Sequence, residues 1–209
     1  MKHEKICVLA SGGVESAVLL DLYSRKEARV FPLYVQHGFV WERAELHWLR
    51  KLIARLRRPS IQPVTILQFP IRPLYGKHWS VAGKGVPSRR SPDRAVFLPG
   101  RNLLLAVLAG LFCYRKGIRR VAVGTLASNP FPDSTARFFR LMEKSVKEAL
   151  GWKLRVERPF AGRSKREVMA RASSLPWHLT FSCLNPRGLR HCGRCNKCAE
   201  RSKAFRKPG

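Results

Sequence analysis

The sequence predicts an α/β protein in which helices cover both faces of a mostly parallel sheet, a Rossmann-like arrangement, with a small zinc-binding segment at the C-terminal end. Two observations predict the sheet. Short apolar runs alternate along the chain with segments whose apolar residues recur at helical spacing, and such alternation gives parallel strands joined by right-handed crossovers. A glycine-rich turn also follows the first apolar run. A third observation, a cluster of cysteines near the C-terminal end, predicts the appended segment.

The N-terminal half provides the first strands and helices. The expected elements are strands at residues 5–10, 29–35 and 64–69, with helices at residues 14–26 and about 41–57 between them. The second of these helices carries an apolar stripe made of Leu46, Leu49, Ile53 and Leu56. One face of that helix is therefore expected to pack against the sheet.

The C-terminal half begins after a long irregular segment, residues 70–97, in which glycine and proline recur among basic and hydroxyl residues. A loop of this kind commonly carries a site or a lid. The alternation then resumes, with helices expected at residues 102–116, 133–150 and 164–174, strands at residues 121–127 and 154–160, and a short final helix at about residues 197–205. Asp133 is expected near the cap of its helix. The resulting division is an α/β domain at residues 1–175 and a zinc-binding segment at residues 176–209.

The charge of the chain is strongly positive. It contains 41 Lys and Arg against 13 Asp and Glu, which gives a formal net charge of +28 and a pI of about 11.2. Such a field attracts polyanions and predicts salt-sensitive binding to RNA or DNA. A general arginine bias, or adaptation to an unusual milieu, would explain the charge without such a partner. The charges are spread along the whole chain, so both explanations stay open at this point.

Hydropathy favours a globular protein of the cytoplasm. A hydrophobic content of 45% in 209 residues suffices for a full core, which excludes a disordered tail. The longest apolar run, residues 103–114, is too short to span a bilayer. Residues 1–5 lack the basic segment followed by an apolar one that begins a secretory signal, so we expect no membrane partner.

The turn between the first expected strand and helix is rich in glycine. Its sequence, SGGVES at residues 11–16, places two glycines where the backbone can approach a ligand closely, ahead of a helix whose free N–H groups favour an anion. The hydroxyls of Ser11 and Ser16 add donors to this cradle, so a phosphate is expected there. The turn lacks the Gly-Lys-Ser or Gly-Lys-Thr of a Walker loop and the three-glycine dinucleotide fingerprint. A purely structural Gly-Gly turn is the alternative.

Four cysteines near the C-terminal end predict a metal site. Cys192, Cys195 and Cys198 form two overlapping Cys-x-x-Cys pairs, and Cys183 lies nine residues before them. Four thiolates in so short a segment suit one structural zinc ion with a closed tetrahedral shell. An iron-sulfur cluster is the alternative. His191 is expected beside this shell or at the surface rather than within it.

Several of these segments, taken together, resemble one family. Residues 11–16 (SGGVES) are similar to the SGGxDS signature of the PP-loop ATP pyrophosphatases. With residues 97–102 (FLPGRN), residues 131–133 (FPD) and the cysteines, they resemble the 7-cyano-7-deazaguanine synthases over nearly the whole chain. The resemblance implies an adenine nucleotide alpha hydrolase-like fold and an ATP-dependent ligase. Such an enzyme adenylates the carboxylate of 7-carboxy-7-deazaguanine, lets ammonia displace AMP to give an amide, and uses a second ATP to dehydrate the amide to the nitrile that feeds queuosine.

The same resemblance implies which residues form the site. The residues that would hold ATP and Mg²⁺ are Ser11, Gly12, Gly13, Glu15, Ser16, Arg101 and Asn102, and those with a catalytic role are Ser11, Glu15, Ser16, Arg101 and Lys165. The segment Phe131, Pro132 and Asp133 would border the deazapurine. For Lys165 alone an ordinary exposed lysine is the alternative, and for Asp133 alone a simple helix cap. The expected partners are the small-molecule acid, ammonia and a second copy of the chain in a homodimer.

Three departures from the family pattern predict a divergent branch whose acceptor could differ from the deazapurine acid. Glu15 stands where the signature has Asp, Val35-Gln36-His37-Gly38 replaces Tyr-Gly-Gln, and Thr135 stands where the family has Arg. Two other functions therefore stay open. One is a PP-loop enzyme that modifies RNA by thiolation or by activating a base carbonyl, which the charge of +28 favours. The other is a tRNA-binding paralogue that has lost turnover through Glu15.

Overall fold

A five-stranded parallel sheet forms the centre of the molecule. The computed structural model describes residues 4–25 and 29–206. The strands are β1 (Lys5–Leu9), β2 (Arg29–Gln36), β3 (Thr65–Gln68), β4 (Arg120–Ala122) and β5 (Arg155–Glu157). Their order across the sheet is β3-β2-β1-β4-β5, and every neighbouring pair is parallel. The predicted α/β class is confirmed.

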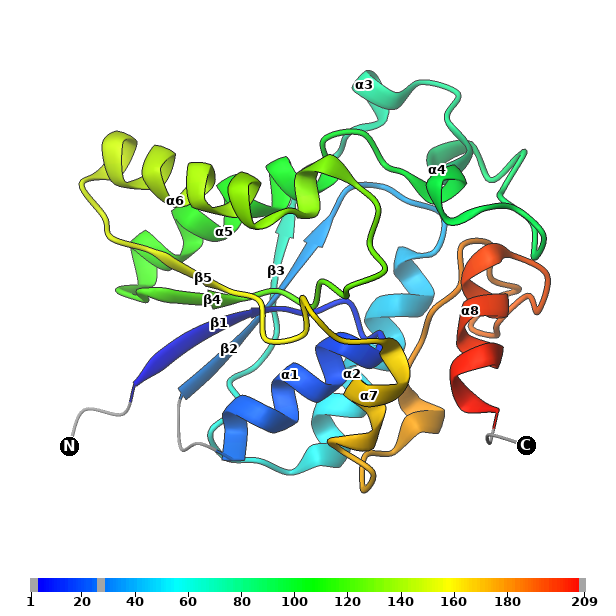
Figure 1. Cartoon of the computed structure of the whole chain (residues 1–209), viewed down its shortest axis with the longest axis horizontal. Coiled ribbons are helices and arrows are strands. Elements are labelled where there is room, and N and C mark those ends of the chain that lie inside the picture. Colours follow the sequence, from blue (N-terminus) through cyan, green and yellow to red (C-terminus); the bar gives the residue numbers. More distant parts are fainter. Residues whose placement is uncertain (1–3, 26–28, 207–209) are drawn as a thin grey trace.

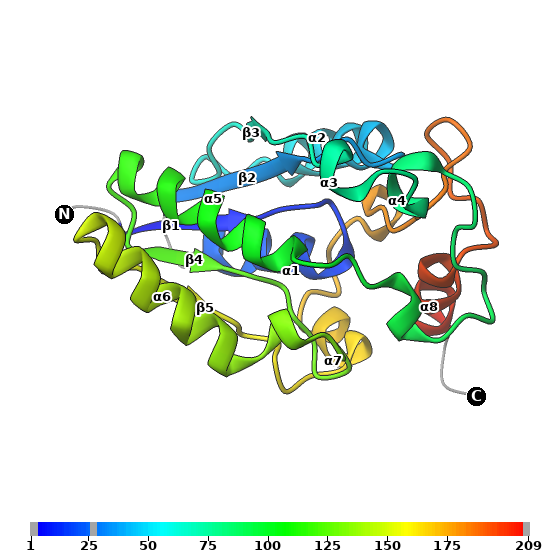
Figure 2. The same cartoon turned by 90° about the horizontal axis from the view of Figure 1, so that it is seen from above.

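Helices cover both faces of this sheet (Figure 1). On one face lie α1 (Val14–Arg25), α2 (Glu42–Leu56) and α7 (Lys165–Ala170), and on the other lie α5 (Arg101–Lys116) and α6 (Ala136–Leu150). Figure 2 shows α5 and α6 running side by side across the sheet. None of the helices in the described part of the chain is long and apolar enough to cross a membrane.

Alternation along the central strand explains why both faces are covered. Ile6 and Val8 point into the core cluster formed with α1 and α2, whereas Cys7 between them points into the cluster formed with α5 and α6. All three side chains are completely buried. Because successive residues of a strand face opposite sides, an uninterrupted apolar strand requires cover on both of its faces. The stripe of α2 that the sequence predicts is confirmed, since Leu46 and Leu49 are buried in the first cluster.

The C-terminal segment packs beyond the carboxyl ends of the strands. It contains a short 3-10 helix, η3 (Trp177–Leu179), and α8 (Asn196–Phe205), which lies near the loop between β3 and α5 (Figures 1 and 2). Its residues Phe181 and Leu184 share a core cluster with Phe39 and Trp41, which lie just before α2. This segment therefore shares part of its core with the α/β domain. The division at residue 175 stays a prediction.

Several expected boundaries are wrong in extent. The strand expected at residues 121–127 contains only β4, because the chain turns away from the sheet at Gly124, where it passes directly over Glu15. The strand expected at residues 154–160 is only β5. Residues 70–97 are not wholly irregular, since they contain α3 (Arg72–Tyr75), α4 (Trp79–Ala82) and the 3-10 helix η1 (Asp93–Val96).

Helix ends also differ from the expectation, and the largest difference concerns Asp133. The helix begins at Ala136 and its cap is Thr135, whose hydroxyl accepts from the Phe138 N–H at 3.1 Å. Asp133 lies before it in the 3-10 helix η2 (Pro132–Ser134), and its carboxylate is bonded to Asn102 instead. The expected role of Asp133 as a cap of its own helix is therefore wrong.

Two other expected helices are present with different ends. The helix expected at residues 164–174 ends at Ala170 and begins with a capping box between Ser164 and Glu167. The helix expected at residues 14–26 ends at Arg25, and Lys26 lies outside the described residues.

Candidate active site

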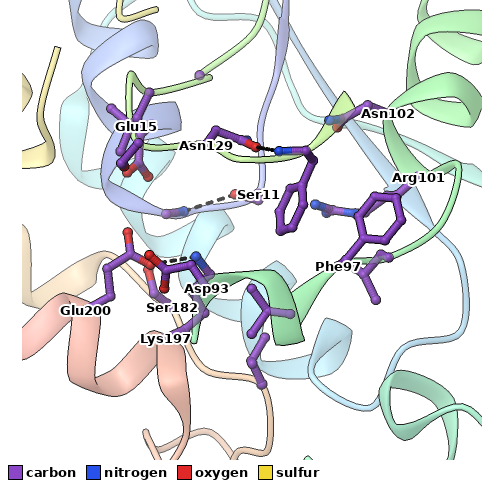
Figure 3. Close-up of a pocket in the computed structure, with 18 of the residues that line it drawn as sticks. Ser11, Glu15, Asp93, Phe97, Arg101, Asn102, Asn129, Ser182, Lys197 and Glu200 are labelled. Carbon is purple, nitrogen blue, oxygen red and sulfur yellow. Dashed lines mark hydrogen bonds and ion pairs between the residues drawn. The ribbon is translucent and has the colours of Figure 1, made fainter. Parts of the chain in front are cut away.

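A cavity of about 280 Å³ opens at the carboxyl ends of β1 and β4. In open parallel sheets this edge is where ligands bind. A second cavity of about 200 Å³ adjoins it. The two share Ser11, Glu15, Arg101, Asn102, Gly124 and Asn129 as lining residues. Figure 3 shows Glu15 on one wall, Lys197 and Glu200 of α8 on a second, and Phe97 with Arg101 on a third.

The glycine-rich turn forms the floor of this cavity next to β1. Gly12 has a φ of 81°, a conformation that favours glycine, and a Cβ there would lie 3.2 Å from the Cβ of Leu49 in α2. The hydroxyl of Ser16 accepts from the Gly12 N–H at 3.0 Å and donates to the Gly13 carbonyl at 3.1 Å. Ser16 therefore holds the turn in shape from inside. Ser11 lines both cavities, whereas Gly12 backs onto α2 and is not part of either lining.

An alternating row of charges crosses the cavity. The Lys165 ammonium lies 2.9 Å from the Glu15 carboxylate and 2.7 Å from that of Glu200. The other oxygen of Glu200 lies 2.6 Å from the Lys197 ammonium. The Lys165 side chain is only 13% exposed, so it is not an ordinary surface lysine. Burial by itself would lower the pKa of Lys165, but Glu15 and Glu200 raise it above its ordinary value, and the side chain stays charged at neutral pH.

Arg101 faces this row from the first turn of α5. It lines both cavities, and its buried Nε has no hydrogen-bond partner among the described residues. Next to it Tyr34 donates its hydroxyl to the Glu45 carboxylate at 2.9 Å. Burial raises the pKa of Glu45 to about 7, against the lowering influence of Arg101. A guanidinium that lines a cavity is suited to bind a phosphate or a carboxylate.

The segment expected to border the deazapurine provides an aromatic wall. The rings of Phe97 and Phe131 have centroids 5.0 Å apart at an angle of 31°, and both residues line the larger cavity. The Asp133 carboxylate accepts from the Asn102 N–H at 3.1 Å and from its side-chain amide at 3.3 Å. Asp133 also lines the cavity, but Pro132 does not. The carboxylate thus caps the start of α5 from a position open to a ligand.

The four predicted cysteines come together beside this cavity. The sulfurs of Cys183, Cys192, Cys195 and Cys198 all lie within 4.8 Å of one another. Backbone N–H groups point at these sulfurs, for example that of Leu184 at Cys195 (3.4 Å). The donor set fits one metal ion held by four thiolates, which is the set that zinc prefers. His191 stands outside it, since its Nε2 accepts from the Ser182 N–H at 3.1 Å.

The sequence analysis missed several residues of the cavity, among them the polar residues Glu45, Ser182 and Glu200. Glu45 lies in an amphipathic helix, where acidic residues are ordinarily solvated. Ser182 reaches the cavity because the Phe181 N–H donates to the Gly12 carbonyl at 2.8 Å and so draws residues far apart in sequence together. For Glu200 a signal existed, because it follows Cys198 of the predicted metal site by two positions on the same helix.

These features define an α/β nucleotide-binding enzyme with a four-cysteine centre beside its cavity. They are a parallel sheet, a glycine-rich turn at the end of its central strand, and a cavity lined by lysines, carboxylates and an arginine. The family model described as "Queuosine biosynthesis protein QueC" matches residues 5–209. The chain belongs to this family of ATP-dependent ligases. The predicted membership is confirmed.

Individual relatives agree with this assignment. The chain is 30% identical over 209 residues to "7-cyano-7-deazaguanine synthase 1" of Desulfitobacterium hafniense (strain Y51), covering 98% of this chain and 93% of the relative. It is 28% identical over 219 residues to "7-cyano-7-deazaguanine synthase" of Aquifex aeolicus (strain VF5), covering 98% of each.

Solved structures of lower identity share the fold alone. A 4-thiouridine synthetase in complex with RNA and ATP has a TM-score of 0.53 at 17% identity, covering 96% of this chain and 49% of that one. A predicted subunit of a tRNA methyltransferase from Methanocaldococcus jannaschii has a TM-score of 0.53 at 13% identity, covering 81% and 74%.

Proposed function

We propose that this chain converts 7-carboxy-7-deazaguanine and ammonia to 7-cyano-7-deazaguanine at the expense of two ATP molecules. The family membership supports the reaction, and one structural observation carries it: the turn at residues 11–16, Lys165 and Arg101 meet at a single cavity. The family match favours this function over RNA modification and over a binding protein without turnover. Because Glu15 and Thr135 depart from the family pattern, the identity of the acceptor has to be tested directly with the deazapurine acid.

The first half of the reaction forms an acyl-adenylate. An oxygen of the substrate carboxylate attacks the α-phosphorus of ATP, the bond from that phosphorus to the bridging oxygen breaks, and pyrophosphate leaves. Ammonia then attacks the acyl carbon, AMP departs with one former carboxylate oxygen, and a proton is lost to give the amide. Lys165, beside the turn, would neutralise charge on the leaving pyrophosphate, while Arg101 would bind the α-phosphate or the carboxylate.

The second half removes the remaining oxygen. The amide oxygen attacks the α-phosphorus of a second ATP and pyrophosphate leaves again. The amide nitrogen then loses two protons as AMP departs with the oxygen, which leaves the nitrile. The same cavity serves both halves because the reacting oxygen occupies the same position each time.

We also propose that Glu15 binds Mg²⁺ together with the phosphates of ATP. Magnesium prefers oxygen ligands and is commonly bound through one or two carboxylates plus phosphates. Glu15 lines both cavities next to the turn, so its carboxylate fits this role. The ion would offset the negative charge of the triphosphate. Because Glu is one methylene longer than the Asp of the signature, its carboxylate reaches further from α1.

The deazapurine is proposed to bind between the aromatic wall and Asp133. A flat base stacks favourably on the rings of Phe97 and Phe131. The Asp133 carboxylate is placed by Asn102 and retains acceptor capacity for the N–H donors of a guanine-like edge. Phe131 and Asp133 would thus select the base, and Pro132 would act only through the backbone that it fixes.

We propose that the four cysteines hold one structural zinc ion. A closed shell of four sulfurs leaves no position for a substrate or a reactive water. The ion would fix the segment that carries Ser182 and α8 against the glycine-rich turn. The ion would therefore stabilise the fold and take no part in catalysis.

Two further proposals concern partners. The net charge of +28 favours association with RNA or another polyanion, and salt-dependent tRNA binding measured by fluorescence tests this. An exposed apolar stripe on one face of α5, together with one residue of α6, supports the expected homodimer; its members are Leu103, Val107, Leu111, Tyr114 and Leu141. Light scattering of wild type and Leu111→Glu tests the dimer. The cytoplasmic location stays a prediction.

Product analysis tests the proposed reaction. The zinc-loaded protein is incubated with ATP, Mg²⁺, the acid and ammonium, and nucleotides and deazapurines are separated by chromatography. The proposal predicts two AMP and two pyrophosphate for each nitrile, with no AMP when the acid is left out. AMP that forms equally without the acid, or ADP as the main product, would be incompatible with it.

A further inference from the structure

The four-cysteine centre reaches into the cavity through the first turns of α8. Cys195 immediately precedes this helix and Cys198 lies in its first turn. Lys197, between these two ligands, and Glu200, two positions after them, both line the cavity (Figure 3). The centre therefore fixes the part of α8 that forms one wall of the nucleotide site.

The contacts of Glu200 show what this wall does. One carboxylate oxygen lies 2.7 Å from the Lys165 ammonium and the other lies 2.6 Å from that of Lys197. The side chain of Glu200 is 26% exposed, and that of Lys165 is 13% exposed. Lys165 thus has two carboxylate partners, Glu15 from α1 and Glu200 from α8. Those two helices are far apart in the sequence, and this lysine bridges them.

A triphosphate in the cavity changes the balance of these charges. Its oxygens compete with Glu15 for the Lys165 ammonium, and a cation that accompanies ATP competes with Lys165 for Glu15. A buried ammonium that loses one partner needs another, because an unpaired buried charge is costly. Glu200 remains available for this purpose, since its position depends on α8 and not on the turn that receives the phosphates.

We propose that Glu200 is a positioning residue for the adenylation reaction, which holds the Lys165 ammonium at the cavity wall beside the turn at residues 11–16. The inference rests on the proposed function and extends it to a residue outside the glycine-rich turn. It also gives the cysteine centre a role in the site, because the centre that fixes α8 fixes Glu200 as well. Lys197 completes the arrangement by occupying the second oxygen of Glu200.

A double-mutant cycle tests whether Glu200 acts through Lys165. The variants are Glu200→Gln, Lys165→Met and the two combined, with Glu148→Gln on the exposed face of α6 as a control for the loss of one negative charge. The loss of a charge-assisted bond predicts a fall of about ten- to a hundredfold in kcat/KM for ATP in Glu200→Gln. The double variant is expected to be no worse than Lys165→Met alone.

Losses that multiply in the double variant would overturn the inference, and so would a Glu200→Gln protein as active as the control. Zinc content and melting temperature separate positioning from damage, since both are expected to match those of the control. Glu200→Asp keeps the charge and is expected to recover part of the activity. A purely structural role predicts no such recovery.

A binding measurement separates this inference from the proposed function. Calorimetry with a non-hydrolysable ATP analogue and Mg²⁺ requires no turnover. Glu200→Gln is expected to weaken the affinity about tenfold when Lys165 is present and not at all in the Lys165→Met background. A wild-type protein that binds the analogue but forms no acid-dependent AMP contradicts the proposed function alone. Equal affinity of wild type and Glu200→Gln contradicts the inference alone.

Discussion

Gly124 lies directly against Glu15: a Cβ at position 124 would be 2.7 Å from the Cβ of Glu15. Gly124 follows β4, and Glu15 lies in the first turn of α1, which follows β1. The two strands are parallel neighbours, so the segments that leave their carboxyl ends meet. Glycine at position 124 therefore allows Glu15 to stand at the cavity beside Lys165.

The first prediction is that Gly124→Ala damages the ATP site. The added methyl group would force Glu15 and its turn to shift, and overpacking of this kind typically costs about 1 to 3 kcal/mol. We expect kcat/KM for ATP to fall by about tenfold or more. Gly162→Ala is the matched control, because a Cβ at position 162 meets nothing within 4 Å. Wild-type kinetics in Gly124→Ala would show that the contact does not matter.

The second prediction separates the capping role of Asp133 from its proposed role in binding the base. Asp133→Ala removes the acceptor of the Asn102 N–H and should cost about 1 kcal/mol of stability. Thr135→Ala removes the cap of α6 and should cost about as much. Only Asp133→Ala should also raise the KM for the acid, by about tenfold or more. Equal KM values for the acid in both variants would restrict Asp133 to a structural role.

The third prediction concerns pH and Glu45. Burial raises the pKa of this carboxyl from 4.5 to about 7. Arg101 and the Tyr34 hydroxyl act in the opposite direction, and Glu42 adds to the rise. As the pH rises, Glu45 therefore loses its proton in the unfolded chain before it does so in the folded protein. The contribution of Glu45 to the free energy of unfolding is fully present below pH 4.5 and is lost as the pH rises to about 7. The loss amounts to about 2 to 3 kcal/mol between pH 5 and pH 8.

Glu45→Gln removes this titration and keeps an acceptor for the Tyr34 hydroxyl. Urea denaturation should show that, between pH 5 and pH 8, the free energy of unfolding of the variant rises relative to that of wild type by about 2 to 3 kcal/mol. Glu148→Gln, with an exposed side chain, should show no such gain. A stability difference between Glu45→Gln and wild type that is the same at both pH values would mean that Glu45 is ionised like an exposed carboxyl.

The fourth prediction is that the cysteine centre contributes to folding. Native mass spectrometry should find one zinc per wild-type chain and none in Cys195→Ser. The loss of several kcal/mol of metal-binding free energy should lower the melting temperature by about 10 °C. Cys113→Ala removes a core thiol far from the centre and should retain the zinc. Visible absorbance of an iron-sulfur cluster in the wild type would contradict the choice of metal.

Much of the fold was predictable from local patterns. The strand, turn and helix at the N-terminal end follow from an apolar run, two glycines and helical spacing. The short spacing of the four cysteines predicts that their sulfurs lie close together. Such signals are contained within a few residues. They therefore survive without knowledge of the tertiary structure.

Other features depend on contacts between distant segments. Asp133 caps α5 rather than its own helix because the loop after β4 crosses the start of α5, and nothing near position 133 indicates this. Glu45 looks like a solvated helix residue until the fold brings Tyr34 beside it, and the pairing of Glu200 with Lys165 joins two helices far apart in the sequence. Short strands such as β4 are also hard to delimit, since the apolar run continues into the residues that form the cavity.

The oxygen atoms of the substrate provide the most direct test of carboxylate adenylation. The acid is prepared with ¹⁸O in both carboxylate oxygens, and the AMP formed by the wild-type protein is weighed by mass spectrometry. Transfer of the carboxylate oxygens to phosphorus predicts one ¹⁸O in each of the two AMP molecules that accompany a nitrile. AMP without the label would mean that water attacks the α-phosphorus, and the account of the cavity as a site of carboxylate activation would be wrong.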